Sequence, residues 1–539
     1  MKIFKFCQKY LLSHKLSVIM YLIFTLCAVI TSIISPLIVA GFLDNLIANG
    51  TVNVIIRICI SFVIINGFSI LIGYVNTITY AKLQTTMAYQ LNKDVIHHVQ
   101  NLSLSYSSQT DTSYLVQRIN SDSNELITFC MNVIQNITGN VVILVIPFLI
   151  MMTINSIISL FLISFFVLYV IMYILSRNIL YHTNYILKEQ RDTFFSKLHD
   201  QLKYINLIKL NGIDFTDKLQ RAFKNLLKAF IKGQKATYLV YGLDNIIKIL
   251  AQVMLFIIGG IQILEGKFTI GMFTMFSSYF TMVLGAGSYF FNLGASYQTC
   301  LAAHNRLEYI LSTKQESVGN RSLLDINTIT LKNVNLKNKK NNRLSNMFSG
   351  RFEKGNIYAI VGANGTGKST IASLIMGMYI DEREGDIQYN DISINSLNMS
   401  DIRRKQLAFA EQEPALLSDT IRYNITLSQK VNNEEDDRIL EYAKILGIEK
   451  FVTEATLGSF FEEENVPTSG GEKQKIAILR VLYKDTPVMI FDEPTSALDS
   501  KSIKSFINYL GSIKKEKIII IITHDEYVSK TCDRVVSVG

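Results

Sequence analysis

The stretch with the most specific chemistry runs from Gly362 to Thr370 and reads Gly-Ala-Asn-Gly-Thr-Gly-Lys-Ser-Thr. It lies between an apolar run of strand length and a run with helical spacing, and it fits the phosphate-loop pattern of Gly, four residues, Gly-Lys-Ser. Glycines let the backbone turn tightly with its N–H groups inward, so no Cβ blocks a phosphate. We therefore predict a nucleotide-binding loop made of Gly362, Ala363, Asn364, Gly365, Thr366, Gly367, Lys368, Ser369 and Thr370.

Two residues of this loop have distinct predicted roles. Lys368 would reach the β- and γ-phosphates, and the hydroxyl of Ser369 would bind Mg²⁺. The N-terminus of the helix that begins here adds a field that favours anions. A glycine-rich turn without a ligand is the alternative, and the strand before and helix after the loop argue against it. The predicted ligands are ATP and Mg²⁺.

Further chemistry follows two later apolar runs. Four apolar residues end in Asp492 and Glu493, so Asp492 is placed to hold Mg²⁺ and Glu493 to polarise an attacking water as general base. His524 lies two residues after the all-isoleucine run Ile518–Ile522 and is the only histidine after residue 325. A γ-phosphate contact and a purely structural role are both open for this histidine.

The composition indicates a membrane protein of more than one domain. The chain has 539 residues, of which 49% are hydrophobic and only 18% charged. This is too apolar for an ordinary soluble protein and too long for one compact core. The six cysteines are scattered without a CxxC pair or metal-ligand spacing, so a disulfide framework or a zinc site is not expected.

Apolar runs long enough to cross about 30 Å of hydrocarbon occur before residue 300. We predict six membrane helices, near residues 16–43, 54–80, 134–153, 156–178, 245–264 and 270–293. The two long stretches between them have helical spacing and little Gly or Pro, which predicts extensions of the helices into the cytosol. After the linker the pattern changes to short β-branched runs alternating with amphipathic helices, typical of an α/β domain.

The fold class we predict is therefore an all-α transmembrane domain of six helices followed by an α/β P-loop NTPase domain. The predicted bounds are 1–313 for the transmembrane domain, 314–324 for a polar linker and 325–539 for the nucleotide-binding domain.

The distribution of basic residues predicts the orientation. The three predicted outer loops contain Lys267 and no arginine, whereas the N-terminal segment and the long inner stretches are rich in both. The positive-inside rule then puts the N-terminus and the nucleotide-binding domain in the cytosol, with the helices in the cytoplasmic membrane. The formal charge of +9 is explained by these segments, and no basic patch with a recognition helix predicts a nucleic-acid partner.

The order of these motifs resembles that of the ATP-binding cassette (ABC) transporters, and the whole chain resembles an exporter-type half-transporter of that family. The resemblance matches Gly362–Thr370 to the Walker A loop and Asp492-Glu493 to the end of Walker B. It implies a catalytic and metal-contacting role for Gln412, and a switch role for His524. It also implies nucleotide contacts for the signature and D-loop residues Ser469, Gly470, Gly471, Glu472 and Asp499, and coupling helices near Ser107 and Gly212–Asp214.

The resemblance implies a dimer, because ATP would be held between the Walker A loop of one nucleotide domain and the signature of another. The second domain would come from another copy of the chain or from a related half-transporter. Three positions depart from the family pattern: Asn338 stands where an aromatic usually stacks on adenine, and Thr468 and Glu472 replace the usual Leu and Gln of the signature. Glu493 and His524 are intact, so we expect an active ATPase.

The cargo is less clearly indicated. Met and aromatic residues in the run 270–293 suit a cavity for amphipathic cargo, although helix packing and lipid contact are the favoured explanation. Asp244 and Lys248 are spaced as a functional pair at membrane depth or as an intrahelical pair near the interface. The function we predict is ATP-driven export of a hydrophobic or amphipathic substrate, a peptide among the candidates. A lipid flippase and an ATP-gated channel or regulatory ATP sensor are the alternatives.

Overall fold

The structure is a computed structural model that describes residues 2–48, 50–104, 106, 112–212, 216–317, 319–336, 347–428, 433–459 and 470–538. Contacts divide the chain into two compact units. The first comprises Met1–Gln100 with Thr112–Thr313, and the second comprises Asn101–Asp111 with Lys314–Gly539.

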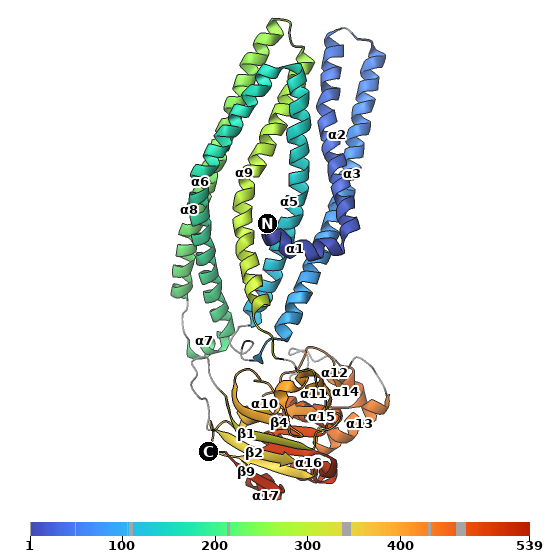
Figure 1. Ribbon diagram of the computed structural model, residues 1–539, viewed down its shortest axis with the longest axis vertical. Coiled ribbons are helices and arrows are strands. Elements are labelled where there is room, and N and C mark those ends of the chain that lie inside the picture. The colour runs from blue at the N-terminus through green and yellow to red at the C-terminus, as the bar shows by residue number, and fades with distance from the viewer. Residues whose placement is uncertain are drawn as a thin grey trace. The chain divides into compact units, whose positions relative to one another are not determined.

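The first unit is built of helices (Figure 1). They are α1 (Lys2–Ser13), α2 (Lys15–Ile47), α3 (Val52–Gln100), α5 (Thr112–Ile154), α6 (Ser156–Lys203), α7 (Ile205–Asn211), α8 (Thr216–Leu264) and α9 (Ile270–Ser312). Within the described residues, five segments are long and apolar enough to cross a membrane, in α2, α3, α5, α8 and α9. The remaining predicted span, 156–178, lies in α6, where several side chains fall outside the described set. The chain is thus a multi-pass membrane protein, with each predicted span inside one helix.

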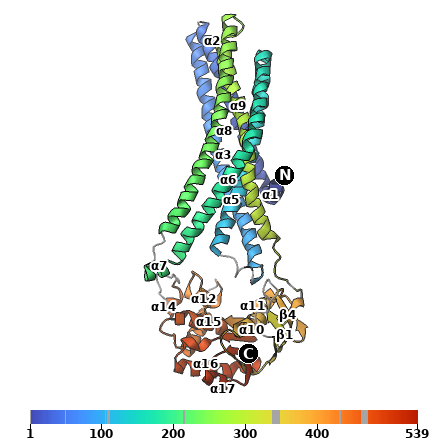
Figure 2. The same cartoon turned by 90° about the vertical axis from the view of Figure 1, so that its left-hand side faces the viewer.

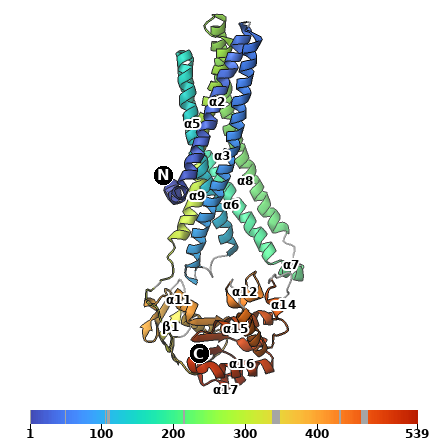
Figure 3. The ribbon, with the colours of Figure 1, turned by 90° about the vertical axis from the view of Figure 1, so that its right-hand side faces the viewer.

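Several helices are much longer than a membrane is thick. Helices α3 and α8 each have 49 residues and α6 has 48, so each is about 70 Å long at 1.5 Å per residue. Helices α6 and α8 lie side by side (Figures 1 and 2), as do α2 and α3 (Figure 3). The length beyond the span agrees with the predicted helical extensions.

A one-residue turn joins α5 to α6, as the spacing of the apolar runs predicts. Asn155 caps α6 by accepting a hydrogen bond at Oδ1 from the backbone N–H of Ile158 (3.1 Å). Its Nδ2 donates to Oε1 of Gln262 in α8 (2.6 Å). The side chain of Asn155 therefore caps α6 and also connects the α5–α6 hairpin to α8.

The second unit contains two sheets. Its strands are β1 (Thr328–Leu336), β2 (Phe348–Glu353), β3 (Asn356–Val361), β4 (Arg383–Tyr389), β5 (Ile392–Ser393), β6 (Leu407–Ala410), β7 (Val488–Asp492), β8 (Ile518–Ile522) and β9 (Arg534–Ser537). Five of them form a parallel sheet in the order β6-β7-β8-β3-β9. The others form an antiparallel sheet in the order β2-β1-β4-β5, which adds to the mostly parallel arrangement predicted from the sequence.

Helices cover the parallel sheet. They are α10 (Lys368–Ile375), α11 (Met399–Lys405), α12 (Ile421–Thr426), α13 (Asn433–Ile445), α14 (Glu454–Leu457), α15 (Gly470–Lys484), α16 (Ser500–Ile513) and α17 (Glu526–Thr531), with short 3₁₀ turns η1 (Ile394–Ser396), η2 (Pro494–Ala497) and η3 (Lys514–Glu516). One core joins α10, α11 and the antiparallel sheet to one face of the parallel sheet, and a second core joins α12, α13, α15 and α16 to the other.

Strand β8 explains this layering. All five of its isoleucines are completely buried, and alternate residues enter the two cores: Ile518, Ile520 and Ile522 on one face, Ile519 and Ile521 on the other. A strand covered on both faces needs a continuous apolar run rather than an alternating one. Strand β8 is therefore the central strand of the parallel sheet. The candidate site lies where β3, β7 and β8 end.

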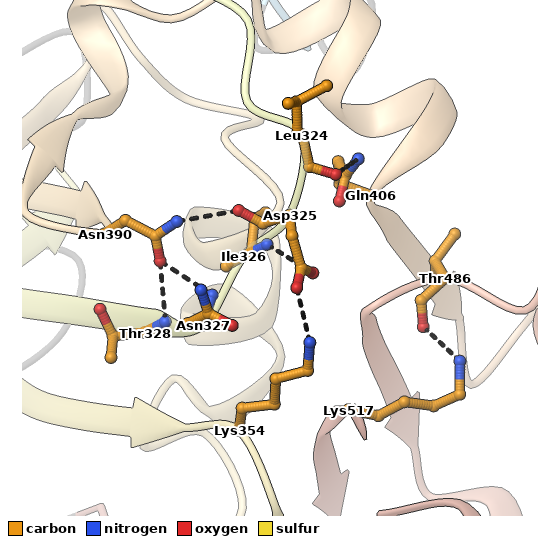
Figure 4. A network of polar contacts seen from close by, with 10 residues as sticks. All are labelled: Leu324, Asp325, Ile326, Asn327, Thr328, Lys354, Asn390, Gln406, Thr486 and Lys517. Carbon is orange, nitrogen blue, oxygen red and sulfur yellow. Dashed lines mark hydrogen bonds and ion pairs between the residues drawn. The ribbon is translucent and has the colours of Figure 1, made fainter. Parts of the chain in front are cut away.

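Side-chain amides fix the entry of the chain into the second unit (Figure 4). Asn390, whose backbone is left-handed with φ 49°, accepts hydrogen bonds at Oδ1 from the N–H groups of Asn327 (2.8 Å) and Thr328 (3.0 Å). Its Nδ2 donates to the carbonyl of Asp325 (2.8 Å), and Gln406 donates to the carbonyl of Leu324 (2.9 Å). The backbone of four residues before and at the start of β1 is thereby held by side-chain amides.

Candidate functional site

The phosphate loop connects β3 to α10, and its glycines are required by the backbone. Gly365 and Gly367 have φ of 82° and 96°, in the left-handed region that L side chains rarely adopt. Gly362 has a different reason, because a Cβ built on it would lie 2.2 Å from the carbonyl oxygen of Val538. The loop thus has the tight turn that the sequence predicts.

Lys368 places a cation inside this loop. Its side chain is buried, and Nζ donates to the carbonyl oxygens of Gly362 (2.9 Å) and Ala363 (3.0 Å). Lys368 is also the first residue of α10, so the ammonium and the positive end of the helix lie together. Both features favour an anion of high charge, such as a triphosphate.

Asp492 and Ser369 supply the metal-binding chemistry. Asp492 ends β7 and is 4% exposed. Burial raises the pKa of the Asp492 carboxyl, while a hydrogen bond with the Ser369 side chain and the charge of Lys368 oppose this shift. Mg²⁺ is usually held by one or two carboxylates together with substrate phosphates and water, so this hydroxyl and carboxylate fit it. The bound ion would neutralise charge on the phosphates.

Glu493 receives its orientation from two side chains that come from distant parts of the chain. Gln412 Nε2 donates to Glu493 Oε2 (3.1 Å), and His524 Nε2 lies 3.2 Å from Oε1. The side chain of Glu493 is 25% exposed, so the carboxylate has access to water. The structure therefore brings together the three residues predicted to be catalytic, in an arrangement suited to a general base.

The backbone of Glu493 is strained. Its φ of 48° and ψ of 49° are left-handed, and its N–H donates to the carbonyl of Ile522 in β8 (2.9 Å). Gln474 in α15 holds the same residue, with Nε2 donating to the carbonyl of Glu493 (2.8 Å) and Oε1 accepting from the hydroxyl of Ser496 (2.8 Å).

Gln474 is a site residue that the sequence reasoning missed. It is 5% exposed and shares the buried face of α15 with Ala477, Ile478 and Val481. A glutamine at a core position of an amphipathic helix was the available signal, because a buried amide must find partners.

The signature residues are described in part. Gly470, Gly471 and Glu472 form the first turn of α15, and Gly470 is exposed. The N-terminus of a helix of 15 residues leaves backbone N–H groups suited to an anion. Ser469 and Thr468 lie outside the described residues, as do Asn338 at the adenine position and Ser107, Ile213 and Asp214 of the coupling segments.

Asp499 has a structural role in addition to its predicted nucleotide contact. It caps α16, with Oδ1 accepting from the N–H of Ser502 (2.7 Å). This backbone hydrogen bond lowers the pKa of Asp499, so the residue is ionised at neutral pH. The contact with nucleotide stays a prediction.

The run 270–293 and the pair Asp244 and Lys248 each had two interpretations, one as a functional site and one as ordinary packing or pairing. Phe276 and Tyr279 of α9 are completely buried within the first unit, which favours the packing interpretation for this helix. Lys248 Nζ lies 2.7 Å from Asp244 Oδ2, as expected of an intrahelical pair.

A phosphate loop after a buried strand, with a second strand that ends in two carboxylates, defines a P-loop ATPase domain. In the same chain a set of long apolar helices forms a multi-pass membrane unit. The class of protein is therefore an ATP-driven membrane transporter.

Comparison with known proteins identifies the family. A model of the ABC transporter transmembrane region matches residues 18–286, and a model described as ABC transporter matches residues 345–496. The chain belongs to the ABC transporter family as an exporter half-transporter, and it hydrolyses ATP to drive transport. The resemblance predicted from the motifs is confirmed.

Relatives and a solved structure match nearly the whole chain. It is 26% identical over 533 residues to the multidrug resistance-like ATP-binding protein MdlB of Buchnera aphidicola, covering 96% of this chain and 89% of that protein. It is 25% identical over 523 residues to the nisin transport ATP-binding protein NisT of Lactococcus lactis, covering 89% and 82%. An ATP-bound bacterial Atm1-family ABC exporter shares the fold, with a TM-score of 0.84, 22% identity and coverage of 97% and 93%.

Proposed function

We propose that this protein is an exporter of amphipathic peptides that works as a dimer in the cytoplasmic membrane, with the nucleotide-binding domain in the cytosol. The observation that carries the catalytic part is the carboxylate of Glu493, which Gln412 and His524 hold from two sides beside Asp492. A base oriented in this way activates water without needing to reorganise when the substrate binds.

Each polar residue of the site has a role in this proposal. Lys368 and the loop N–H groups bind the β- and γ-phosphates, and Ser369 with Asp492 holds Mg²⁺, with Gln412 nearby. Glu493 takes the proton of the attacking water, and His524 contacts the γ-phosphate. Gln474 is a positioning residue, because it acts on the backbone of Glu493 rather than on substrate.

The proposed dimer follows from the position of the signature. Half-transporters of this fold generally function as dimers. Gly470 is exposed at the start of α15, so these N–H groups are accessible to a nucleotide carried by a second subunit. ATP would then drive closure because it binds the closed pair more tightly than the open pair. Either a homodimer or a pair with a related half-transporter satisfies this geometry.

Two features favour peptide as the cargo. The relative NisT is named for nisin transport and aligns with 89% of this chain. The membrane unit also has uncharged hydrogen-bonding side chains between its helices, such as Gln135 and Asn132, which suit a peptide better than a lipid chain. The relative MdlB is named multidrug resistance-like, so small amphipathic molecules are the second candidate.

The test is transport by the purified protein in proteoliposomes. Inside-out vesicles expose the nucleotide-binding domain, and we expect MgATP to drive a labelled amphipathic peptide into the lumen. The Glu493→Gln variant should bind ATP and fail to accumulate peptide. A fluorescent phospholipid is assayed in parallel, and ion current is recorded across planar bilayers. Lipid movement without peptide uptake would assign a flippase, and ATP-gated current with negligible turnover would assign a channel.

A further inference from the structure

A group of uncharged polar side chains lies between α2, α3 and α5 in the membrane unit. It consists of Tyr21 and Thr25 of α2, Asn76 and Tyr80 of α3, and Asn132 and Gln135 of α5, and we name it the amide seam. Five of these residues lie at the cytosolic end of the predicted spans 16–43, 54–80 and 134–153, and Asn132 lies two residues before the last of these spans. Along α5, Gln135 is about 28 Å from Ile154, the last residue of the helix, at 1.5 Å per residue. This is close to the thickness of the hydrocarbon layer, about 30 Å, so the two residues lie near opposite faces of the membrane.

Hydrogen bonds across the helices hold the amides of α5 in place. The hydroxyl of Tyr21 donates to Oε1 of Gln135 (2.7 Å), and that of Tyr80 donates to Oδ1 of Asn132 (2.9 Å). The two tyrosine rings are in contact, with centroids 5.9 Å apart. Asn76 Nδ2 donates to Thr25 Oγ1 (3.4 Å), so every seam residue has a neighbour within the seam.

These contacts use only part of the hydrogen-bonding capacity of the amides. A carboxamide offers two N–H donors and an oxygen acceptor. Asn132 is exposed and Gln135 is half-buried, and among the described residues no group accepts a hydrogen bond from Nδ2 of Asn132 or from Nε2 of Gln135. The oxygen Oδ1 of Asn76, a residue only 8% exposed, is likewise buried without a partner.

Helix α5 continues this polar face toward the membrane centre. Asn136 and Asn140 follow Asn132 at intervals of four and are half-buried. Asn136 uses one of its two N–H groups to donate to the carbonyl of Asn132 in the same helix (2.8 Å). The opposite face of α5 has exposed apolar residues, Ile137, Val141 and Val145, which suit lipid. An amide with open donors is costly in hydrocarbon, so the polar face must meet water, protein or cargo.

We propose that the amide seam and the polar face of α5 are a subsite that binds the backbone amides of an extended peptide. Peptide groups have one donor and one acceptor each, which matches side-chain carboxamides. The seam contains no charged residue, so it is suited to a neutral segment and would leave a charged group unpaired. From Asn132 to Asn140 the face is about 12 Å long, the length of about four residues of extended chain.

This subsite rests on the proposed export function, and its test separates the two. The chain has no tryptophan, so a peptide with one tryptophan gives a fluorescence signal free of protein background. The probes are a short blocked peptide of Leu, Ala and one Trp, and the same peptide with every backbone nitrogen methylated. Binding to the purified dimer in nanodiscs is measured without ATP, and basal ATP turnover is measured without peptide.

We expect the wild type to bind the unmethylated peptide at least about tenfold more tightly, because methylation removes donors and each hydrogen bond contributes about 0.5–1.5 kcal/mol. The double variant Asn132→Leu, Gln135→Leu should bind both peptides equally weakly. The control Asn66→Leu changes an amide of α3 that donates to the carbonyl of Phe62 in its own helix, and it should keep the preference.

Equal binding of the two peptides by the wild type would overturn the proposal, and this measurement needs no variant to fold. A second result would also overturn the proposal: the double variant forms less dimer, and the dimer that remains keeps the preference for the unmethylated peptide. The amide seam would then be assigned to contact between subunits. ATP-driven uptake of both peptides alike would leave the export function standing and remove only this subsite.

Discussion

The nucleotide site and the amide seam are both polar groups assembled from distant segments, and they differ in how fully those groups are paired. In the nucleotide site both carboxylate oxygens of Glu493 have a partner, and its backbone N–H and carbonyl are bonded as well. In the seam, the tyrosine hydroxyls are paired while the N–H groups of Asn132 and Gln135 have no acceptor among the described residues.

This difference fits the two tasks. Catalysis needs groups fixed in one geometry before the substrate arrives, which full pairing provides. Binding of varied cargo needs groups whose remaining capacity is free for the ligand. The same residue types can therefore serve either purpose, and the number of open donors and acceptors distinguishes them.

The largest expected effect is on ATP turnover at the fully paired site. Glu493→Gln keeps the shape of the side chain and removes the base, so turnover should fall at least about 100-fold. Binding of MgATP should persist because Lys368 and the loop are unchanged. Phosphate release and nucleotide binding are measured on the same preparation. The control Glu526→Gln changes an exposed carboxylate of α17, and turnover equal to the control would exclude Glu493 as the base.

The second effect concerns a fully paired contact in the membrane unit. Arg306 of α9 donates from Nε to Asp122 Oδ2 of α5 (2.7 Å) and from its terminal nitrogen to Oδ1, and the Asp122 side chain is 4% exposed. Arg306→Leu leaves this carboxylate buried and unpaired, so unfolding in detergent should become easier by about 3–5 kcal/mol.

Replacing both partners with leucine should recover most of this loss, because no charge is then left buried. The control is Lys197→Leu, which breaks an ion pair with Asp200 whose side chains are 51% and 46% exposed, and it should change stability little. If Arg306→Leu resembled the control, pairing in the membrane unit would not be the source of its stability.

The third effect tests whether Gln474 acts through Glu493. Gln474→Leu removes the hydrogen bond to the carbonyl of Glu493, so kcat should fall about tenfold while KM for ATP stays unchanged. Ser496→Ala removes the hydroxyl that lies 2.8 Å from Gln474 Oε1 and 3.0 Å from the carbonyl oxygen of Glu493. It leaves the hydrogen bond from Gln474 to Glu493 in place, so it should have a smaller effect. A rise in KM with kcat preserved would assign Gln474 to nucleotide binding instead.

The smallest effect concerns the buried carboxyl of Asp492. Burial raises its pKa, so the ionised form is less favourable in the folded protein than in the unfolded chain. Above this raised pKa, Asp492→Asn should therefore increase the Tm of the nucleotide-free protein by a few degrees at most. The advantage should disappear as the pH falls below about 4, where aspartate is protonated in both states.

Tm is measured across this pH range for the wild type, Asp492→Asn and the exposed control Asp437→Asn. The control should show no comparable gain. An advantage of Asp492→Asn that grew as the pH fell would contradict the direction of the shift.

The sequence alone predicts the parts whose chemistry is local. The phosphate loop, the carboxylates of β7, and the histidine after β8 follow from short patterns, because each belongs to a strand end and its next few residues. The membrane spans are predictable for a similar reason, since a helix in lipid must satisfy its backbone internally and carry an apolar surface. The antiparallel sheet and the amide network around Asn390 have no such local pattern.

The sequence by itself thus determined the family, the ATPase chemistry and the multi-pass helical character of the membrane unit. Only the tertiary structure decided that Gln474 supports Glu493 and that Tyr21 and Tyr80 meet the amides of α5. The physical reason is that a motif specifies its own backbone, whereas a hydrogen bond such as that between Tyr21 and Gln135 joins residues more than a hundred positions apart. Packing of the whole helical unit, rather than any short pattern, sets that distance.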